Sequence, residues 1–206
     1  MTVLGIFAHP DDEVLGCGGT LARLAKEGDE VHVGVLGVRH LSLEFAKACA
    51  VLGVKDVCTE HLPDQRFDTI PLLEMIQRIE SLIALIQPTI LYTHHTHDLN
   101  HDHALTAQAV LTATRPKPGQ CVKEVLMCEI PSSTEWAFNG AFNPNVFVDI
   151  SETLNTKLNA MELYATEVRD YPHPRSRPAL NNLACMRGAN VGLSRAEAFE
   201  LVRAIR

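Results

Sequence analysis

The side chains best suited to chemistry near the start of the chain lie in one short stretch, AHPDDE at residues 8–13. It follows an apolar run that is typical of a buried strand and precedes apolar residues at helical spacing. Polar groups at the end of a buried strand are costly to pack unless something binds them. Imidazole and carboxylate groups bind metal ions such as zinc, and a second carboxylate nearby can act as a general base.

A second polar stretch, THHTHDLNHDH, occupies residues 93–103 and contains five of the ten histidines of the chain. It also follows an apolar run, residues 89–92. A catalytic zinc site typically has three nitrogen or oxygen ligands from side chains and one open position for water. If the two preceding strands are neighbours in a parallel sheet, both stretches lie at the edge where ligands bind. Together they could hold a metal ion that activates a water molecule.

Purely structural roles are the alternative for these residues. The helix dipole favours acids at the start of a helix, and this effect would by itself account for Asp11, Asp12 and Glu13 without any function. It does not account for the preceding histidine or for the second, histidine-rich stretch. The GCGG segment at 16–19 is similar to part of a dinucleotide-binding fingerprint, but three acids stand where a pyrophosphate would bind. Close helix–sheet packing is the better interpretation of these glycines.

Secondary-structure elements of alternating type must position the two stretches. Up to residue 114 the apolar patterns predict strands and helices in alternation, which implies right-handed crossovers and a mainly parallel sheet. The expected fold class is α/β, a Rossmann-like three-layer arrangement with helices flanking the sheet. The predicted strands are 2–8, 30–38, 56–61 and 89–95, and the predicted helices are 13–28, 43–53, 71–87 and 102–114.

The rest of the chain shows a less regular pattern. A turn-rich joint leads to predicted strands at 122–130 and 145–150 and to a long helix at 151–168. Residues 170–178 are expected to form a loop, and 193–205 a final amphipathic helix. Because 206 residues suit one domain, residues 1–206 are expected to fold as a single unit.

Composition limits the class of partner. A net charge of −7 argues against binding nucleic acid by phosphate neutralisation and leaves small-molecule substrates open. The six cysteines form no C-x-x-C pair, and no basic region precedes the first apolar run. We therefore expect reduced cysteines in a cytoplasmic protein. No apolar run approaches the roughly 18 residues of a transmembrane helix, so no integral membrane segment is expected.

The AHPDDE motif and the later D-x-N-x-D-H segment, residues 98–103, resemble the LmbE-like (PIG-L) family. Members of this family are zinc-dependent deacetylases of N-acetylated sugars and sugar conjugates. The resemblance extends through LPDQRFDT at 62–69 and YPHPRS at 171–176. It implies a hydrolase with one Zn²⁺ per chain, or another divalent transition metal, acting on a small N-acetylated sugar or glycoconjugate. Oligomers are common among relatives, which leaves a homo-oligomer open.

The resemblance also implies roles for individual residues. The metal ligands of the family match His9, Asp12 and His103, and its general base matches Asp11. The base would take a proton from the water that the metal activates. Asp102 matches the acid just before the last ligand, and we expect it to orient neighbouring groups at the catalytic centre.

Five residues are expected to contact the substrate: Asp64, His101, Arg39, His173 and Arg175. Asp64 matches an acidic position that contacts substrate hydroxyls in relatives. Arg175 could bind a phosphate or carboxylate of the substrate. The alternative is that Arg175 pairs with an internal acid such as Asp170 or Glu197.

One position departs from the family pattern. Several relatives have a histidine three residues before the last metal ligand, where it stabilises the oxyanion or protonates the leaving amine. Here that residue is Asn100, which could donate to an oxyanion but cannot transfer a proton. The proton donor therefore stays open between Asp11 and the histidines at positions 94, 95, 101 and 173.

Two other classes of function stay open from the sequence. One is a metal-dependent hydrolase of another bond, such as a phosphoester, which usually needs two metals about 4 Å apart. A second bound metal would favour it. The other is a non-catalytic glycan- or nucleotide-binding protein with the same fold, which a failure to bind metal would favour.

Overall fold

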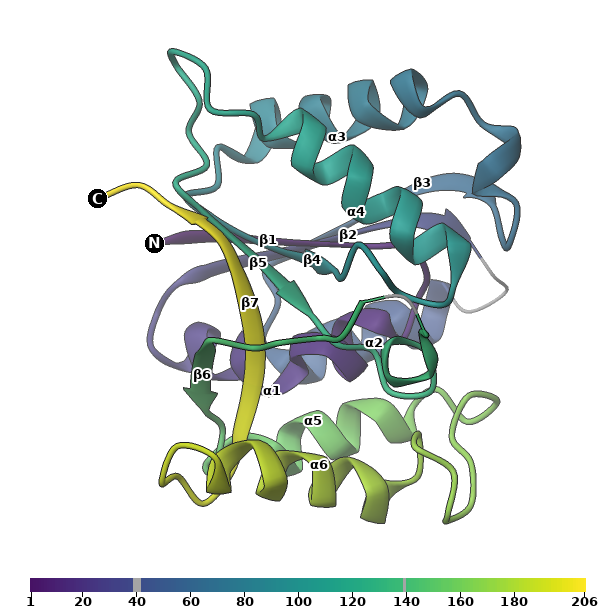
Figure 1. Ribbon diagram of the computed structural model, residues 1–206, viewed down its shortest axis with the longest axis vertical. Helices are drawn as coiled ribbons and strands as arrows, with labels where there is room; N and C mark the ends of the chain where they lie inside the picture. Colours follow the sequence, from purple (N-terminus) through teal and green to yellow (C-terminus); the bar gives the residue numbers. More distant parts are fainter. Residues whose placement is uncertain (39–41, 139) are drawn as a thin grey trace.

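The computed structural model describes residues 1–38, 42–138 and 140–206 (Figure 1). Its strands and helices alternate up to residue 114, as predicted. The strands are β1 (Thr2–Phe7), β2 (Glu30–Val38), β3 (Asp56–Pro63), β4 (Ile90–His94), β5 (Glu124–Cys128), β6 (Val146–Asp149) and β7 (Ala196–Ala204). The helices are α1 (Asp12–Lys26), α2 (Ser42–Leu52), α3 (Leu72–Ile86), α4 (His101–Ala113), α5 (Leu154–Glu162) and α6 (Arg177–Ala189), with short 3-10 helices η1 (Phe67–Thr69) and η2 (Thr134–Trp136).

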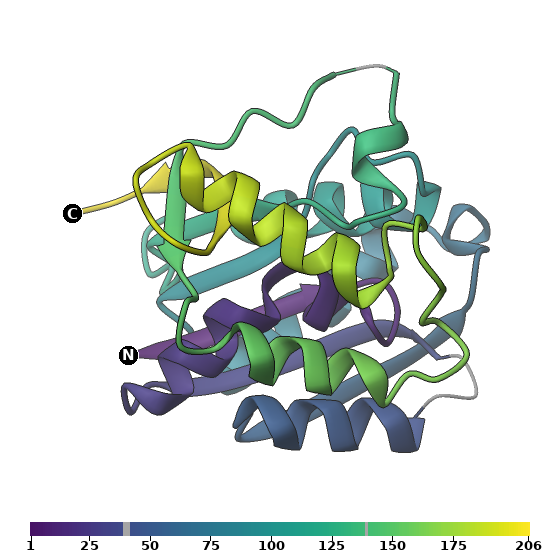
Figure 2. The same cartoon turned by 90° about the horizontal axis from the view of Figure 1, so that it is seen from below.

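The strands of the described residues form one seven-stranded sheet in the order β3-β2-β1-β4-β5-β7-β6. Strands β1 to β5 pair in parallel, whereas β7 runs antiparallel between β5 and β6. Helices α3 and α4 cover one face, and α1, α2, α5 and α6 cover the other (Figure 1 and Figure 2). This three-layer arrangement confirms the predicted fold class. In the part of the chain that is described, no helix is long and apolar enough to cross a membrane.

The central strand β1 is buried on both faces. Val3 and Phe7 belong to the core that packs under α1, while Leu4 and Ile6 belong to the core under α3 and α4. A strand covered on both faces needs an almost continuous apolar sequence, which TVLGIF provides. Because β4 pairs directly with β1, the residues that follow these two strands meet at one edge of the sheet.

Helix α1 is interrupted at Cys17, where φ is −146° and ψ is 19°. A buried ion pair satisfies the backbone groups at this break. Nζ of Lys157 donates to the carbonyl of Leu15 at 2.9 Å and to Oε1 of Glu197 at 2.6 Å. The same Oε1 accepts the backbone N–H of Gly19 at 3.0 Å. The pair therefore fixes the direction of the first turn of α1, which carries Asp12 and Glu13 of the AHPDDE motif.

The glycines of the GCGG segment allow close packing, as predicted. A Cβ atom on Gly16 would lie 2.6 Å from Sγ of Cys128 on β5. A Cβ atom on Gly19 would lie 2.9 Å from the side chain of Ile150. Larger residues at either position would push α1 away from the elements behind it.

The predictions for the last third of the chain were wrong in three places. Residues 193–205 were expected to form a helix but contain β7, and α6 begins inside the segment expected to be a loop. The helix predicted at 151–168 is also shorter, since α5 covers nine residues. The Ala- and Glu-rich sequence of β7 favours a helix locally, but pairing with β5 and β6 outweighs that propensity.

Candidate active site

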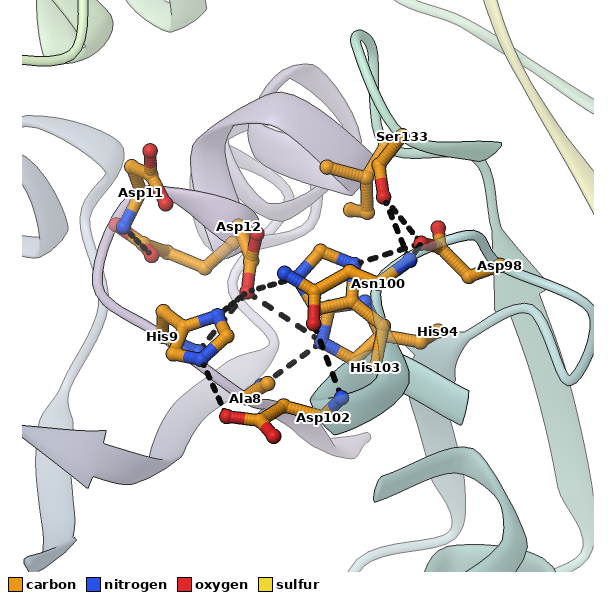
Figure 3. A network of polar contacts seen from close by, with 12 residues as sticks. Ala8, His9, Asp11, Asp12, His94, Asp98, Asn100, Asp102, His103 and Ser133 are labelled. Atoms are coloured by element: carbon orange, nitrogen blue, oxygen red, sulfur yellow. Dashed lines mark hydrogen bonds and ion pairs between the residues drawn. The ribbon is translucent and has the colours of Figure 1, made fainter. Parts of the chain in front are cut away.

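The two polar stretches lie together where β1 and β4 end (Figure 3). His9 follows β1, and Asp12 lies in the first turn of α1. His103 lies in the first turn of α4, the helix that follows β4 at the same edge of the sheet. All three side chains are at most 2% exposed, so their charges interact in surroundings that hold little water.

Three potential ligand atoms converge in this cluster. Nδ1 of His9 lies 3.4 Å from Oδ2 of Asp12, and Nε2 of His103 lies 3.3 Å from the same oxygen. Zinc–ligand bonds of about 2.0–2.1 Å at tetrahedral angles place ligand atoms about 3.3 Å apart. The cluster therefore fits a mononuclear metal site, and its members are the three ligands that the family resemblance implies.

Each histidine of this cluster has a carboxylate at its second ring nitrogen. Oδ2 of Asp102 lies 3.0 Å from Nε2 of His9, and its Oδ1 accepts the backbone N–H of Phe67 at 3.1 Å. Oδ1 of Asp98 lies 3.2 Å from Nδ1 of His103. Such carboxylate–histidine pairs set the ring orientation and make the metal-facing nitrogen a better ligand.

Asp98 is a site residue to which the sequence patterns assigned no role. Its carboxylate accepts the hydroxyl of Ser133, the Oγ1 of Thr134 at 2.6 Å and the backbone N–H of Asn100 at 2.9 Å. These donors hold it against His103. Its place five residues before His103, at the start of the D-x-N-x-D-H segment, is a signal that could have identified it.

Charges within the cluster determine the protonation of its members. Burial raises the pKa of Asp12, but the charges of His103 and His94 and the hydrogen bonds from His103 and His9 together outweigh burial and hold this pKa well below its usual range. Burial lowers the pKa of His103, but Asp12 and Asp98 outweigh it and raise this pKa to about 10. A proton or a metal ion can therefore balance the two carboxylates that face this ring.

His94 supports the cluster from behind. Its ring stacks on that of His103 with 4.0 Å between centroids. Burial, followed by the charge of His103, lowers the pKa of His94 to about 3. The neutral ring can thus accept the backbone N–H of Ala8 at Nε2, at 2.8 Å.

Asp11 has a strained backbone conformation next to Asp12 of the cluster. Its φ of 105° lies in the region that favours glycine, and its side chain is buried. Oε2 of Glu13 accepts the backbone N–H of Asp11 at 3.0 Å, and Oε1 accepts the hydroxyl of Tyr164 at 2.5 Å. Burial raises the pKa of Glu13 to about 8. No local pattern pointed to Tyr164, which lies 151 residues away in the chain.

Arg175 binds the same aspartate. Its Nη1 donates to Oδ2 of Asp11 at 2.8 Å and to Oε2 of Glu167 at 3.0 Å. Pairing with internal acids was the alternative to a substrate contact, but the acids are these two rather than Asp170 or Glu197. The guanidinium therefore fixes the orientation of the Asp11 carboxylate.

Asp64 and Asn100 lie beside the cluster in different ways. Oδ1 of Asp64 is 3.2 Å from Nε2 of His9, and its side chain is 31% exposed. It therefore faces both the site and the solvent. Asn100 caps α4, because its Oδ1 accepts the backbone N–H of Asp102 at 3.0 Å.

The remaining expected substrate contacts are more distant from the cluster or outside the described residues. His101 is exposed and lines a surface depression with Gln108. His173 is half-buried, and its Nδ1 accepts the backbone N–H of Arg175 at 3.1 Å. Arg39 lies outside the described residues.

The chain matches a family model described as PIG-L, GlcNAc-PI de-N-acetylase, over residues 4–114. Uncharacterized deacetylase YaiS from Escherichia coli K12 is 32% identical over 174 residues, which cover 78% of this chain and 88% of that protein. The probable N-acetyl-alpha-D-glucosaminyl L-malate deacetylase 2 from Bacillus cereus is 25% identical over 185 residues, with 80% and 83% covered.

Solved structures share the fold at lower identity. N,N'-diacetylchitobiose deacetylase from Pyrococcus horikoshii has a TM-score of 0.78 and 20% identity, covering 98% of this chain and 84% of that one. GalB, the 4-carboxy-2-hydroxymuconate hydratase from Pseudomonas putida KT2440, has a TM-score of 0.80 and 22% identity, covering 100% and 97%. Since one of these is a hydratase, the fold alone does not specify the reaction.

Proposed function

The chain belongs to the PIG-L family, and from this membership we propose that it is a metal-dependent hydrolase. Its reaction would remove the acetyl group from the nitrogen of an N-acetylated amino sugar or sugar conjugate. The observation that carries the proposal is the buried triangle of His9, Asp12 and His103, with Asp11 adjacent to one ligand. Two imidazoles and a carboxylate suit one Zn²⁺ per chain, although iron, cobalt or nickel bind similar sites.

Bound in this triangle, the metal ion would supply an activated water molecule and polarise the acetyl carbonyl. Asp11 acts as general base and takes a proton from the attacking water. Arg175 positions the base, since its Nη1 lies 2.8 Å from Oδ2 of Asp11. Asp102 keeps the ring of His9 in the orientation that ligation needs, through the contact of 3.0 Å to its Nε2.

Asn100 is the proposed donor to the developing oxyanion. Because its Oδ1 already accepts the N–H of Asp102, Nδ2 is the half of the amide that donates. An amide cannot transfer a proton, so Asp11 passes the proton it has taken to the leaving nitrogen. Asp64, partly exposed beside His9, contacts a substrate hydroxyl. The products are acetate and a free amine.

The test combines metal analysis with amine release from a panel of N-acetylhexosamine compounds. The Asp11→Asn variant should keep its metal and lose turnover by roughly 10²–10⁴-fold, as expected for loss of a general base. Asp68→Asn makes the same change at an exposed position and is the matched control.

Each outcome separates the proposal from its alternatives. About one metal per chain with release of acetate and amine, both abolished by chelation, supports the deacetylase. Near-normal turnover of metal-loaded Asp11→Asn would remove Asp11 as the base. Two metals per chain with phosphoester cleavage would favour the other hydrolase class. A chain that takes up no metal after reconstitution would favour a binding protein.

A further inference from the structure

One short turn contacts the partners of both the proposed base and a proposed metal ligand. It consists of residues 132–135, which follow β5 and include the first two residues of η2. Since β5 pairs in parallel with β4, this turn lies at the same edge of the sheet as the two motifs. Three of its four residues carry a hydroxyl group, Ser132, Ser133 and Thr134. The partners of these hydroxyls show what the turn supports.

The first hydroxyl of the turn supports the side of the base. Oγ of Ser132 accepts the Nε–H of Arg175 at 2.7 Å, while Nη1 of the same guanidinium donates to Oδ2 of Asp11 at 2.8 Å. Because a guanidinium is planar and rigid, contacts at Nε and at Nη1 together determine its orientation. Ser132 therefore fixes the direction from which Arg175 reaches the proposed base.

The next two hydroxyls support the side of the metal ligand. Oγ of Ser133 donates to Oδ1 of Asp98 (Figure 3). Oγ1 of Thr134 accepts the backbone N–H of Ile130 at 2.7 Å, so its own hydrogen is directed at Oδ2 of Asp98, 2.6 Å away. The carboxylate held in this way lies 3.2 Å from Nδ1 of His103. The two hydroxyls therefore fix the carboxylate that orients a proposed ligand.

The carboxylate of Glu135 holds the backbone of this turn. Its Oε1 accepts the backbone N–H of Ser132 at 2.6 Å, and its Oε2 accepts that of Ser133 at 3.1 Å. Ser132 has a φ of 72°, which lies in the left-handed region that few residues other than glycine adopt. Glu135, itself exposed, therefore stabilises a strained backbone in which two successive hydroxyls reach different partners, Arg175 and Asp98.

We propose that Glu135 is a positioning residue, which holds the 132–135 turn in the conformation that aligns the base and a metal ligand together. This inference rests on the proposed function and adds to it a residue that acts only through others. Its effect on the base passes through Ser132 and Arg175, and its effect on the metal site passes through Asp98. Loss of the Glu135 carboxylate releases the turn, so both alignments weaken at once.

Two measurements on Glu135→Ala test this role. In the metal-loaded enzyme, kcat for an N-acetylhexosamine should fall by about tenfold with a smaller effect on KM, because the base is misplaced. Competition with a chromophoric chelator should show that Zn²⁺ binds about three- to tenfold more weakly, as expected for the indirect loss of hydrogen bonds. Glu135→Gln keeps one accepting oxygen and should recover part of both losses. Glu152→Ala removes another exposed glutamate and is the matched control.

Variants of the hydroxyl residues separate the two routes. Ser132→Ala should affect kcat more than Zn²⁺ affinity, whereas Thr134→Val should affect Zn²⁺ affinity more than kcat measured at saturating metal. In a double-mutant cycle, adding Ser132→Ala to Arg175→Ala should lower kcat little further, because the serine acts through the guanidinium. Fully additive effects of these two changes on kcat would overturn the route from the turn to the base.

The outcomes for Glu135 and for the proposed function are distinguishable. A lower melting temperature of Glu135→Ala with wild-type kcat and Zn²⁺ affinity in the folded protein would overturn positioning and leave the deacetylase intact. A loss of only one of the two properties would overturn the shared support. Weaker Zn²⁺ binding by Glu135→Ala, in a protein whose wild type releases no amine, would support the route to the metal ligand and contradict deacetylation. If Glu135→Ala does not fold, the same comparison is made with Glu135→Gln.

Discussion

Replacing Asp98 with asparagine should weaken metal binding although every proposed metal ligand stays in place. The carboxylate lies 3.2 Å from Nδ1 of His103, and its charge helps to raise the pKa of that ring to about 10. Asparagine has the same shape, but it loses the charge and one of the two acceptor oxygens that bind Thr134 and Asn100. Loss of such a carboxylate partner typically costs about 10–100-fold in metal affinity, or about 1.4–2.7 kcal/mol.

Competition with a chromophoric chelator at fixed pH measures this change, and thermal unfolding of each variant shows that the fold survives. Asp64→Asn is the matched control, because Asp64 lies 3.2 Å from the ring of His9 but is 31% exposed. Asp102 lies closer to the same nitrogen, so the control should lose less affinity than Asp98→Asn. If a folded Asp98→Asn protein bound the metal as tightly as the wild type, the argument that this carboxylate makes His103 a better ligand would be refuted.

Three further changes test other parts of the site. In chelated protein the free energy of unfolding should fall as pH rises from about 6.5 to about 10, as shown by urea titrations. The proton on His103 stabilises the fold below the unfolded pKa of 6.5 and is lost as pH passes through the folded value of about 10; a flat profile would contradict this. Lys157→Met should lower the melting temperature by on the order of 10 °C, because it leaves the charge of Glu197 buried without its partner. Glu197→Gln in the same chain should recover part of the loss in the melting scan. Arg175→Ala should lower kcat by about 10–100-fold with a smaller effect on KM, since it misplaces Asp11. Steady-state kinetics that show only a higher KM would instead make Arg175 a substrate contact.

The fold was predictable where local patterns and tertiary pairing agree. The periodicity of the first 114 residues predicted strands β1 to β4 and helices α1 to α4, which make up most of the parallel part of the sheet. The error at β7 has a physical cause. This strand forms because Phe199 and its neighbours pair with β5 on one side and β6 on the other. Such long-range pairing leaves no mark on the local Ala- and Glu-rich sequence.

The site, like the fold, was predictable from the sequence only in part. The residues of the two motifs meet because their strands pair, which the alternating pattern allowed but did not specify. Contacts from distant loops could not be predicted, and they include the hydroxyl of Tyr164 on Glu13 and the guanidinium of Arg175 on Asp11. Each depends on how the α5–α6 region folds back over the sheet, and that region was also where the predicted helices were wrong.

The backbone at Asp11 shows how stability and chemistry conflict in this site. A φ of 105° is unfavourable for any residue with a Cβ atom, by about 1–2 kcal/mol. The Oε2 of Glu13 on its N–H and the N–H of Leu15 on its carbonyl, at 2.9 Å, hold this conformation. Glycine would adopt it without strain but would remove the carboxylate. Asp11→Gly should therefore be more stable than Asp11→Ala by about 1 kcal/mol in urea unfolding, while both lose turnover equally. If Asp11→Ala proved the more stable variant, the backbone at Asp11 would not be strained. The argument that the carboxylate is kept at this position at a cost in stability would then be refuted.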